Sequence, residues 1–231
     1  MDIGEIISDS IKYPSSNWGK VLILGVIMIA SILIVPIFLV YGYIFRIIKA
    51  TLAGVDELPD FDEIGDMFVD GLKIFVVAIV YAIPVYIIAL ILNLIIGASM
   101  TMTSTTTSLD PMMFWGLIVG NIVFIIVALI IGLIEVIAIA NMAYNDGELG
   151  AAFRFSDIMN IIATIGWGKY IATYIVIAIV GAIGFFIGML TMFILIGIIL
   201  LPLVIAPYIA MFGSRAIGLL VASSIEAEPV E

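Results

Sequence analysis

The chain has 231 residues, of which 65% are hydrophobic and 11% charged, and its mean hydropathy is +1.36. Soluble domains are about 45–50% apolar and about 25% charged, so this composition excludes an ordinary soluble protein and predicts an integral membrane protein. Cysteine and histidine are absent, which excludes disulfides, thiolate nucleophiles, imidazole bases and the usual zinc sites. The net charge of −10 argues against nucleic acid as a partner, because cations supply most of that affinity.

We expect one all-α, polytopic membrane domain over residues 1–231, with about six membrane segments in three hairpins and three interfacial amphipathic helices. In chain order these are an interfacial helix and entry (1–20), a first hairpin or single crossing (21–54), an acidic interfacial helix (55–73), a second hairpin (74–143), an interfacial helix (144–169), a third hairpin (170–220) and a loose acidic tail (221–231).

The first apolar run, Val21–Phe45, allows two interpretations. As one helix it would cross the membrane once, giving five crossings and separating Lys12 and Lys20 from the other cations. As two segments hinged at Pro36, it would return to the side that it left, and all eight Lys and Arg residues would share one side. We favour the hairpin, with both termini in the cytoplasm, although segments of about 16–19 residues are at the lower limit for spanning.

Two further apolar runs, Ile74–Gly97 and Met112–Ala140, form the second predicted hairpin. The segment between them, Ala98–Pro111, is rich in Ser and Thr and carries one charge, Asp110. We interpret this segment as a plain connecting loop outside the membrane rather than a surface-contact site.

The last apolar run, Tyr170–Phe212, contains no charge. At 1.5 Å per residue it would extend about 65 Å as one helix, roughly twice the hydrocarbon thickness, so it must fold back. We expect the turn near Leu190–Phe193, with Pro202 and Pro207 kinking the returning helix.

An internal repeat joins an amphipathic stretch, a glycine with a lysine, and an apolar crossing. Its three copies end in Trp18-Gly19-Lys20, Gly71-Leu72-Lys73 and Trp167-Gly168-Lys169. Trp and Lys at the start of a crossing anchor it at headgroup level. We therefore predict interface anchors at Trp18, Lys20, Lys73, Trp167 and Lys169.

The densest charge cluster contains Asp62, Asp66 and Asp70, which a helix would place in one row. An EF-hand loop beginning at Asp60 fails, because Ile64 and Gly71 replace required oxygen ligands. We predict no metal site and no cofactor. The row is a candidate interaction face for a basic partner, although a merely solvated helix face is the simpler interpretation.

Three polar residues lie within apolar runs. An intramembrane carboxylate such as Glu135 is by default a functional candidate, but its distance from Trp115 places it near the inner headgroups. There it could reach water or pair with Lys73, Arg154 or Lys169. Asn93 and Asn121 are candidates for a hydrogen bond across the second hairpin.

The run Leu58–Lys73 resembles a mostly archaeal family of multi-spanning proteins known as domain of unknown function 4013. The resemblance also includes Tyr13-Pro14, Asn17-Trp18, Gly42-Tyr43, Arg46, Tyr81 and Pro84. At Ile64 the family usually has an aromatic residue. The resemblance implies an uncharacterised membrane protein and carries over no catalytic residues.

We therefore expect a non-enzymatic protein of the cytoplasmic membrane. Its partners would be the lipid bilayer and a protein bound to the inner-face amphipathic helices, and its role membrane organisation or partner binding. The alternative is a small transporter or permease subunit, which should concentrate polar groups near the membrane midplane. A lipid-modifying enzyme is the least favoured class, because few acid or base groups are available. Nothing in the sequence indicates an oligomeric state.

Overall fold

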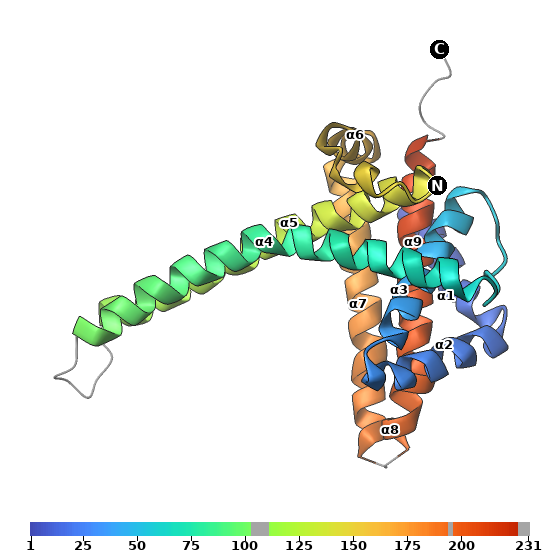
Figure 1. Ribbon diagram of the computed structural model, residues 1–231, viewed down its shortest axis with the longest axis horizontal. Helices are drawn as coiled ribbons and strands as arrows, with labels where there is room; N and C mark the ends of the chain where they lie inside the picture. The colour runs from blue at the N-terminus through green and yellow to red at the C-terminus, as the bar shows by residue number, and fades with distance from the viewer. Residues whose placement is uncertain (103–110, 194–195, 226–231) are drawn as a thin grey trace. The chain divides into compact units, whose positions relative to one another are not determined.

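The computed structural model describes residues 1–102, 111–193 and 196–225, which form helices and loops without a strand (Figure 1). The helices are α1 (Ile3–Ser15), α2 (Trp18–Ala30), η1 (Ser31–Leu33), α3 (Pro36–Leu52), α4 (Ile64–Met102), α5 (Pro111–Tyr144), η2 (Leu149–Phe153), α6 (Phe155–Ile165), α7 (Trp167–Met192), α8 (Gly197–Leu200), η3 (Leu201–Ile205) and α9 (Ala206–Ile225). The chain divides into two compact units, one of Met1–Phe75 with Ile137–Glu231 and the other of Val76–Val136.

Four stretches of the described chain are long and apolar enough to cross a membrane: Ile64–Ile95, Phe114–Tyr144, Trp167–Met192 and Gly197–Ile225. A fifth is possible if α1 and α2, which meet at 80°, are counted together. The prediction of an all-α polytopic membrane protein is confirmed. The expected six segments correspond to these four long helices and to two shorter ones, α2 and α3.

The first apolar run is two helices and not one. α2 ends at Ala30, a short 3-10 turn follows, and α3 begins with Pro36 at its first position, where the missing N–H of proline costs nothing. The break therefore falls at Pro36, as the distribution of cations favours.

The N-terminus of α1 has a reciprocal capping box, in which the Asp2 side chain accepts from the Glu5 amide at 2.8 Å and the Glu5 side chain accepts from the Asp2 amide at 2.7 Å.

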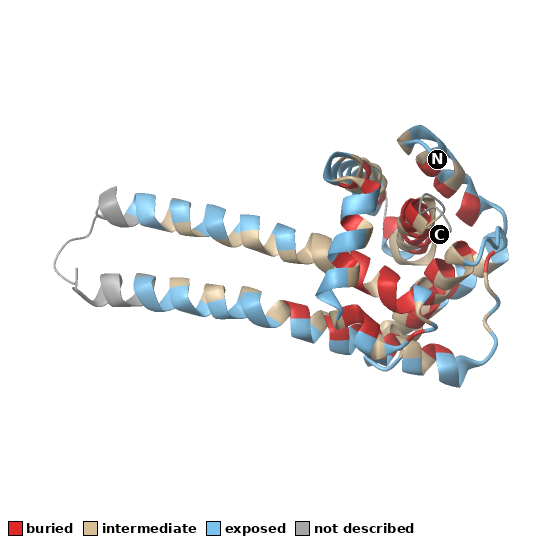
Figure 2. Ribbon diagram, turned by 90° about the horizontal axis from the view of Figure 1, so that it is seen from above, coloured by how far each residue is buried: buried red, intermediate tan, exposed pale blue. Residues whose placement is uncertain are grey.

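In the first unit, α9 is the central helix, packed against α1, α3, α6 and α7 (Figure 1). The buried residues gather around it, including Tyr43 and Phe45 of α3, Ile6 of α1 and Phe212 of α9 itself (Figure 2). Burial of these apolar side chains is what holds the first unit together.

α4 differs from the prediction at its beginning. A separate interfacial helix was expected over 55–73, but residues 55–63 form a loop and α4 runs without a break from Ile64 to Met102. Gly71, expected to separate the two helices, instead allows a close crossing with α3. A Cβ at Gly71 would lie 1.8 Å from the Phe38 carbonyl oxygen, and one at Gly42 would lie 1.8 Å from that of Met67.

The last hairpin agrees with the sequence in its turn and in an irregularity at Pro202, whereas Pro207, also expected to kink the helix, lies in the first turn of α9. α7 ends at Met192 and α8 begins at Gly197, while residues 194–195 lie outside the described part. Pro202 falls in a π-helical turn, Leu201–Ile205, where its missing N–H breaks the regular ladder, and α9 continues from Ala206. Gly188 faces this turn, since an added Cβ would lie 2.2 Å from Leu201 Cδ1.

The second unit consists of the middle of α4 and of α5, up to Val136. Its described exposed side chains are almost all apolar, as expected of helices solvated by lipid (Figure 2). α4 includes Ala98–Met102, which were expected in the loop, and the remainder of that loop, 103–110, lies outside the described residues. The predicted tail begins within α9, and residues 226–231 are likewise not described.

Candidate functional site at an acidic loop

The loop between α3 and α4 is held by its main chain. We call Glu57–Glu63 the clamped loop, because side chains from α1, α2 and α3 donate to six of its seven carbonyl oxygens. The donors are Tyr13 to Glu57 (3.1 Å), Lys20 to Leu58 (2.6 Å), Tyr43 to Pro59 (3.0 Å), and Arg46 to Asp60 (3.2 Å), Asp62 (2.7 Å) and Glu63 (3.0 Å). With its carbonyls held in this way, the loop is a fixed part of the fold.

Apolar residues of the clamped loop add to this hold. Leu58 is buried in the same core cluster as Tyr43, and Phe61 stacks on the Tyr43 ring with 4.0 Å between centroids and 3° between planes. The carboxylates are directed the other way. The side chains of Asp60, Asp62 and Glu63 are 70–77% exposed, although they form ion pairs with Lys20 or Arg46. The loop therefore presents acidic groups from a rigid backbone.

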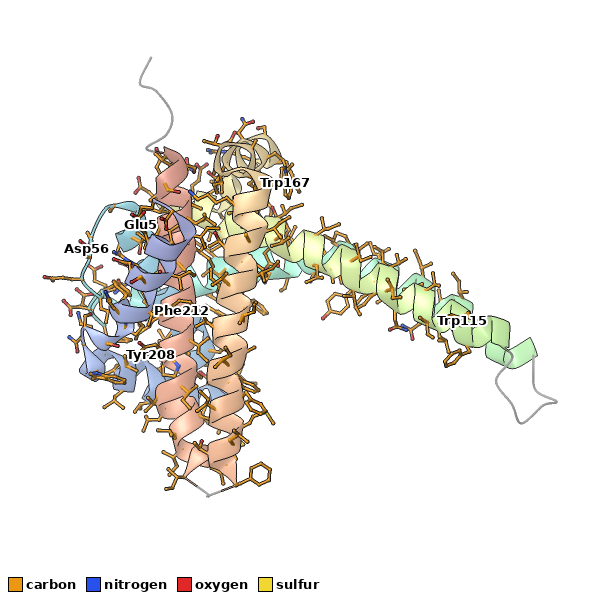
Figure 3. The ribbon with its side chains drawn as sticks, turned by 180° about the vertical axis from the view of Figure 1, so that it is seen from behind. Glu5, Asp56, Trp115, Trp167, Tyr208 and Phe212 are labelled. Atoms are coloured by element: carbon orange, nitrogen blue, oxygen red, sulfur yellow. The ribbon has the colours of Figure 1, made fainter. Side chains whose placement is uncertain are left out.

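Arg215 of α9 is the most buried charge in this region, with 2% of its side chain exposed. Its guanidinium donates to Asp9 at 2.9 Å, to Asp56 at 2.5 Å and to the Val55 carbonyl at 2.9 Å. It also lies 4.7 Å from the centre of the Tyr13 ring, a cation–π contact. Arg215 thus joins α9 to α1 and to the residues just before the clamped loop; Figure 3 labels Asp56 there.

Tyr13 lies between these two sets of contacts. Burial raises the pKa of its hydroxyl to about 12, and the neighbouring Arg215 opposes part of that rise. The phenol is therefore neutral at physiological pH and can donate its proton to the Glu57 carbonyl.

Beside the clamped loop lies an open groove of about 490 Å³, which we call the acidic groove. Five acidic and three basic side chains line it: Asp60, Asp62, Glu63, Asp66, Asp70, Arg46, Lys49 and Lys73. Lys73 pairs with Asp70 at 3.1 Å. Asp66 forms no ion pair within the described part of the chain. The groove keeps an excess of negative charge on a surface that also offers apolar contact at Val69.

Only two of the three carboxylates predicted to form a row along one helix lie on a helix. Asp66 and Asp70 lie on α4, one turn apart, but Asp62 belongs to the clamped loop, where it binds Arg46 at 3.0 Å. All three line the acidic groove. Within the described residues, no cluster of three or more carboxylates could hold a metal ion.

The polar residues of the apolar runs do not meet one another in the second unit. Asn93 donates to the Ala89 carbonyl and Asn121 to the Leu117 carbonyl, each within its own helix, so the expected bond across the hairpin is not formed. Glu135 interacts electrostatically with Tyr81. Among the described ion pairs, none involves Glu135.

The predicted anchors have different surroundings. Lys20 and Lys73 belong to the ion pairs above, and Lys169 donates to Ser223 at 3.2 Å. Trp18 is half exposed and packs 6.0 Å from the Tyr208 ring, whereas Trp167 begins α7 with its ring exposed (Figure 3).

Sequence reasoning missed the role of Arg215, although a signal was present. Arg215 is the only charged residue between Lys169 and Glu226. The rule that singles out Glu135, a lone charge among apolar residues, applies equally to Arg215.

A profile described as Protein of unknown function (DUF4013) matches residues 25–193. This range is well over half of the chain and includes Tyr43, Arg46 and the whole clamped loop. The chain belongs to the DUF4013 family. No curated protein and no solved structure matches it significantly. The match to DUF4013 thus includes two of the four residues that hold the loop, Tyr43 and Arg46. The other two, Tyr13 and Lys20, lie outside it, as does Arg215.

Proposed function

We propose that this member of the DUF4013 family is a non-enzymatic protein of the cytoplasmic membrane that binds a basic segment of a protein partner at the inner face. The observation that carries this proposal is the clamped loop, whose backbone is fixed by six side-chain hydrogen bonds while its carboxylates are exposed. A fixed binding surface loses little conformational entropy when a partner binds.

The electrostatics of the acidic groove support a basic partner. Asp66 has no ion pair among the described residues, and the groove carries more acidic than basic side chains. Ion pairs on this surface, such as Lys73 with Asp70, would orient the lysines and arginines of a partner but would not bind a single metal ion. The amphipathic helices α1 and α6 would lie in the membrane interface and keep this surface at headgroup level.

Two observations favour binding over the alternatives. Transport would need polar groups near the midplane, but Asn93 and Asn121 bond to carbonyls of their own helices. An enzyme would need acid and base groups free beside a substrate site, whereas four of the five carboxylates of the acidic groove are paired with Lys or Arg, which leaves Asp66 alone in the described portion of this surface.

Site-specific photocrosslinking in cells tests the proposal. A benzophenone amino acid in place of Val69, an exposed residue of the acidic groove, should give a discrete protein adduct. The same probe in place of Met159, an exposed residue of α6, should not. Adducts at both positions, or at neither, would refute a specific partner at this groove.

A matched charge change then tests the recognition chemistry. Asp66→Asn should reduce the Val69 adduct several-fold and leave the remaining adduct less sensitive to salt, because the lost charge contact is one that salt screens over about 8–10 Å at physiological ionic strength. Glu5→Gln, at an exposed acid of α1 whose capping box glutamine also satisfies, should leave the adduct unchanged. Equal effects of the two changes would mean that overall charge, and not the groove, controls binding.

A further inference from the structure

The hairpin of α2, η1 and α3 has a charged base and an apolar tip. Lys20 on one arm and Arg46 on the other both bind the clamped loop, since Lys20 pairs with Asp60 at 2.7 Å and Arg46 with Asp62 at 3.0 Å. No charged residue lies between Lys20 and Arg46 in the sequence. Both ends of the hairpin are therefore fixed at one level, beside acidic groups that stay in water.

The arms of this hairpin are too short to cross a bilayer. About ten residues separate Lys20 from the end of α2 at Ala30, and about ten separate Arg46 from the start of α3 at Pro36. At 1.5 Å per residue each arm reaches about 15 Å, and the connecting turn adds only a few ångströms. The hydrocarbon core is about 30 Å thick, so the tip ends near its middle.

The tip is nevertheless built for hydrocarbon. Its four apolar residues are among the most exposed in the described chain: Ile32 (86%), Leu33 (75%), Ile34 (71%) and Val35 (59%). On α2 an exposed apolar face continues toward the base through Leu22, Ile23, Val26 and Ile29. In water these side chains would form an unfavourable apolar patch.

The polar groups of the turn are bonded within the hairpin. The Ile34 amide donates to Ser31, Val35 to Leu33, Ile37 to Ile34 and Phe38 to Val35, while the Ser31 hydroxyl donates to the Ile27 carbonyl. A turn placed in hydrocarbon requires this, because no water is present to satisfy its backbone.

We propose that α2 and α3 form a re-entrant hairpin, which enters the membrane from the side of the clamped loop, ends near the bilayer centre and contacts the acyl chains of one leaflet only. The membrane crossings are then α4, α5, α7 and the helix from α8 to α9. The hairpin is supported from inside the protein, because α2 packs on η3 with Gly25 against the Leu203 carbonyl, and α3 packs on α9. This proposal does not depend on the partner proposed above.

The natural absence of cysteine makes single-cysteine probing direct. The full chain would be reconstituted in phosphatidylcholine vesicles with Leu33→Cys, and with Ser8→Cys and Thr105→Cys as references for the two sides. An impermeant maleimide should label the Ser8→Cys and Thr105→Cys proteins from opposite sides. It should label the Leu33→Cys protein from neither side until detergent is added. Labelling from the Thr105 side would show a full crossing, and labelling from the Ser8 side would show that the tip stays in water; either result overturns the proposal.

A measurement of the depth of residue 33 in the bilayer distinguishes membrane insertion from other causes of protection against the maleimide. A nitrobenzoxadiazole fluorophore on the Leu33→Cys protein should be quenched more strongly by lipids with a nitroxide deep in the acyl chain than by lipids with a nitroxide near the headgroup. Stronger quenching by the shallow nitroxide would refute insertion to the bilayer centre. Ile32→Cys and Val35→Cys provide the same reading if Leu33→Cys does not fold.

Discussion

Replacing Arg215 by Met should destabilise the first unit more than the same replacement of Arg154. Met keeps most of the side-chain volume while removing the bonds to Asp9, Asp56 and the Val55 carbonyl. Hydrogen bonds to charged groups contribute about 1.5–3 kcal/mol each. The two carboxylates are 42% and 87% exposed and will be hydrated once the guanidinium is gone, so we expect a total loss of about 2–4 kcal/mol and not the sum.

Two further variants serve as references for the loss in free energy of unfolding expected for Arg215→Met. Arg154 also pairs with a carboxylate, Glu148 at 2.6 Å, but both side chains are about half exposed. Exposed pairs contribute about 0–1 kcal/mol, so Arg154→Met should change the free energy of unfolding by no more than that. Arg215→Lys should fall between the two, because one ammonium group cannot reproduce the planar fork that binds both Asp9 and Asp56.

The measurement is SDS-induced unfolding in mixed micelles, followed by tryptophan fluorescence. Trp18 reports on the site, since its ring lies 6.0 Å from Tyr208 of α9, and the Tyr208 hydroxyl is in turn bonded to α1 through Ser15 at 2.9 Å. Hydrogen exchange should show the loss concentrated in α1. An Arg215→Met protein no less stable than Arg154→Met would refute the role of Arg215 as the buried link between α1, α9 and the loop.

Three other predictions follow from the structure. Gly42→Ala should lower the free energy of unfolding by about 1–3 kcal/mol in the same assay, because the new methyl group meets a backbone carbonyl of α4. Gly65→Ala, with open space around it, should be neutral or slightly stabilising. Equal effects of the two changes would mean that the close crossing of α3 and α4 does not contribute to stability. The raised pKa of Tyr13 means that the folded state keeps the phenol proton, so the stability that this group contributes should be complete below about pH 10 and fall between pH 10 and 12, a loss that Tyr13→Phe should make smaller. In cells, cysteines at Ser8 and Ser223 should be labelled from the cytoplasmic side, and labelling of the two from opposite sides would contradict a returning first hairpin.

Hydropathy predicted the long helices well because a bilayer imposes its thickness on the sequence. The hinge at Pro36 was predicted because cations on both arms must stay on one side. The helix expected over 55–73 was wrong at its start for a tertiary reason. Leu58 and Phe61 have the spacing of a helix face, but they are apolar because they pack into the core beside Tyr43. A periodic pattern cannot distinguish these two origins.

The candidate site was less predictable than the fold. The acidic residues are visible in the sequence, but the groups that fix them come from distant segments: Arg215 is 206 residues from Asp9 and 159 from Asp56. The sequence around Arg215 is apolar and does not indicate which loop this arginine will bind. The exposure of Asp56 and the burial of Arg215 could likewise be learned only from the packing of α1, α3 and α9.

Lys20 and Arg46 connect the first hairpin to the clamped loop. Lys20 and Arg46 end the apolar arms of the hairpin and also hold the loop carbonyls. If the tip lies among acyl chains, a change in bilayer thickness or packing that tilts α2 or α3 moves these donors. The part of the loop at Leu58 should follow, because Leu58 is buried and its carbonyl would lose the donor Lys20. The arrangement therefore links the lipid environment of one leaflet to the shape of the acidic groove, where a partner would bind.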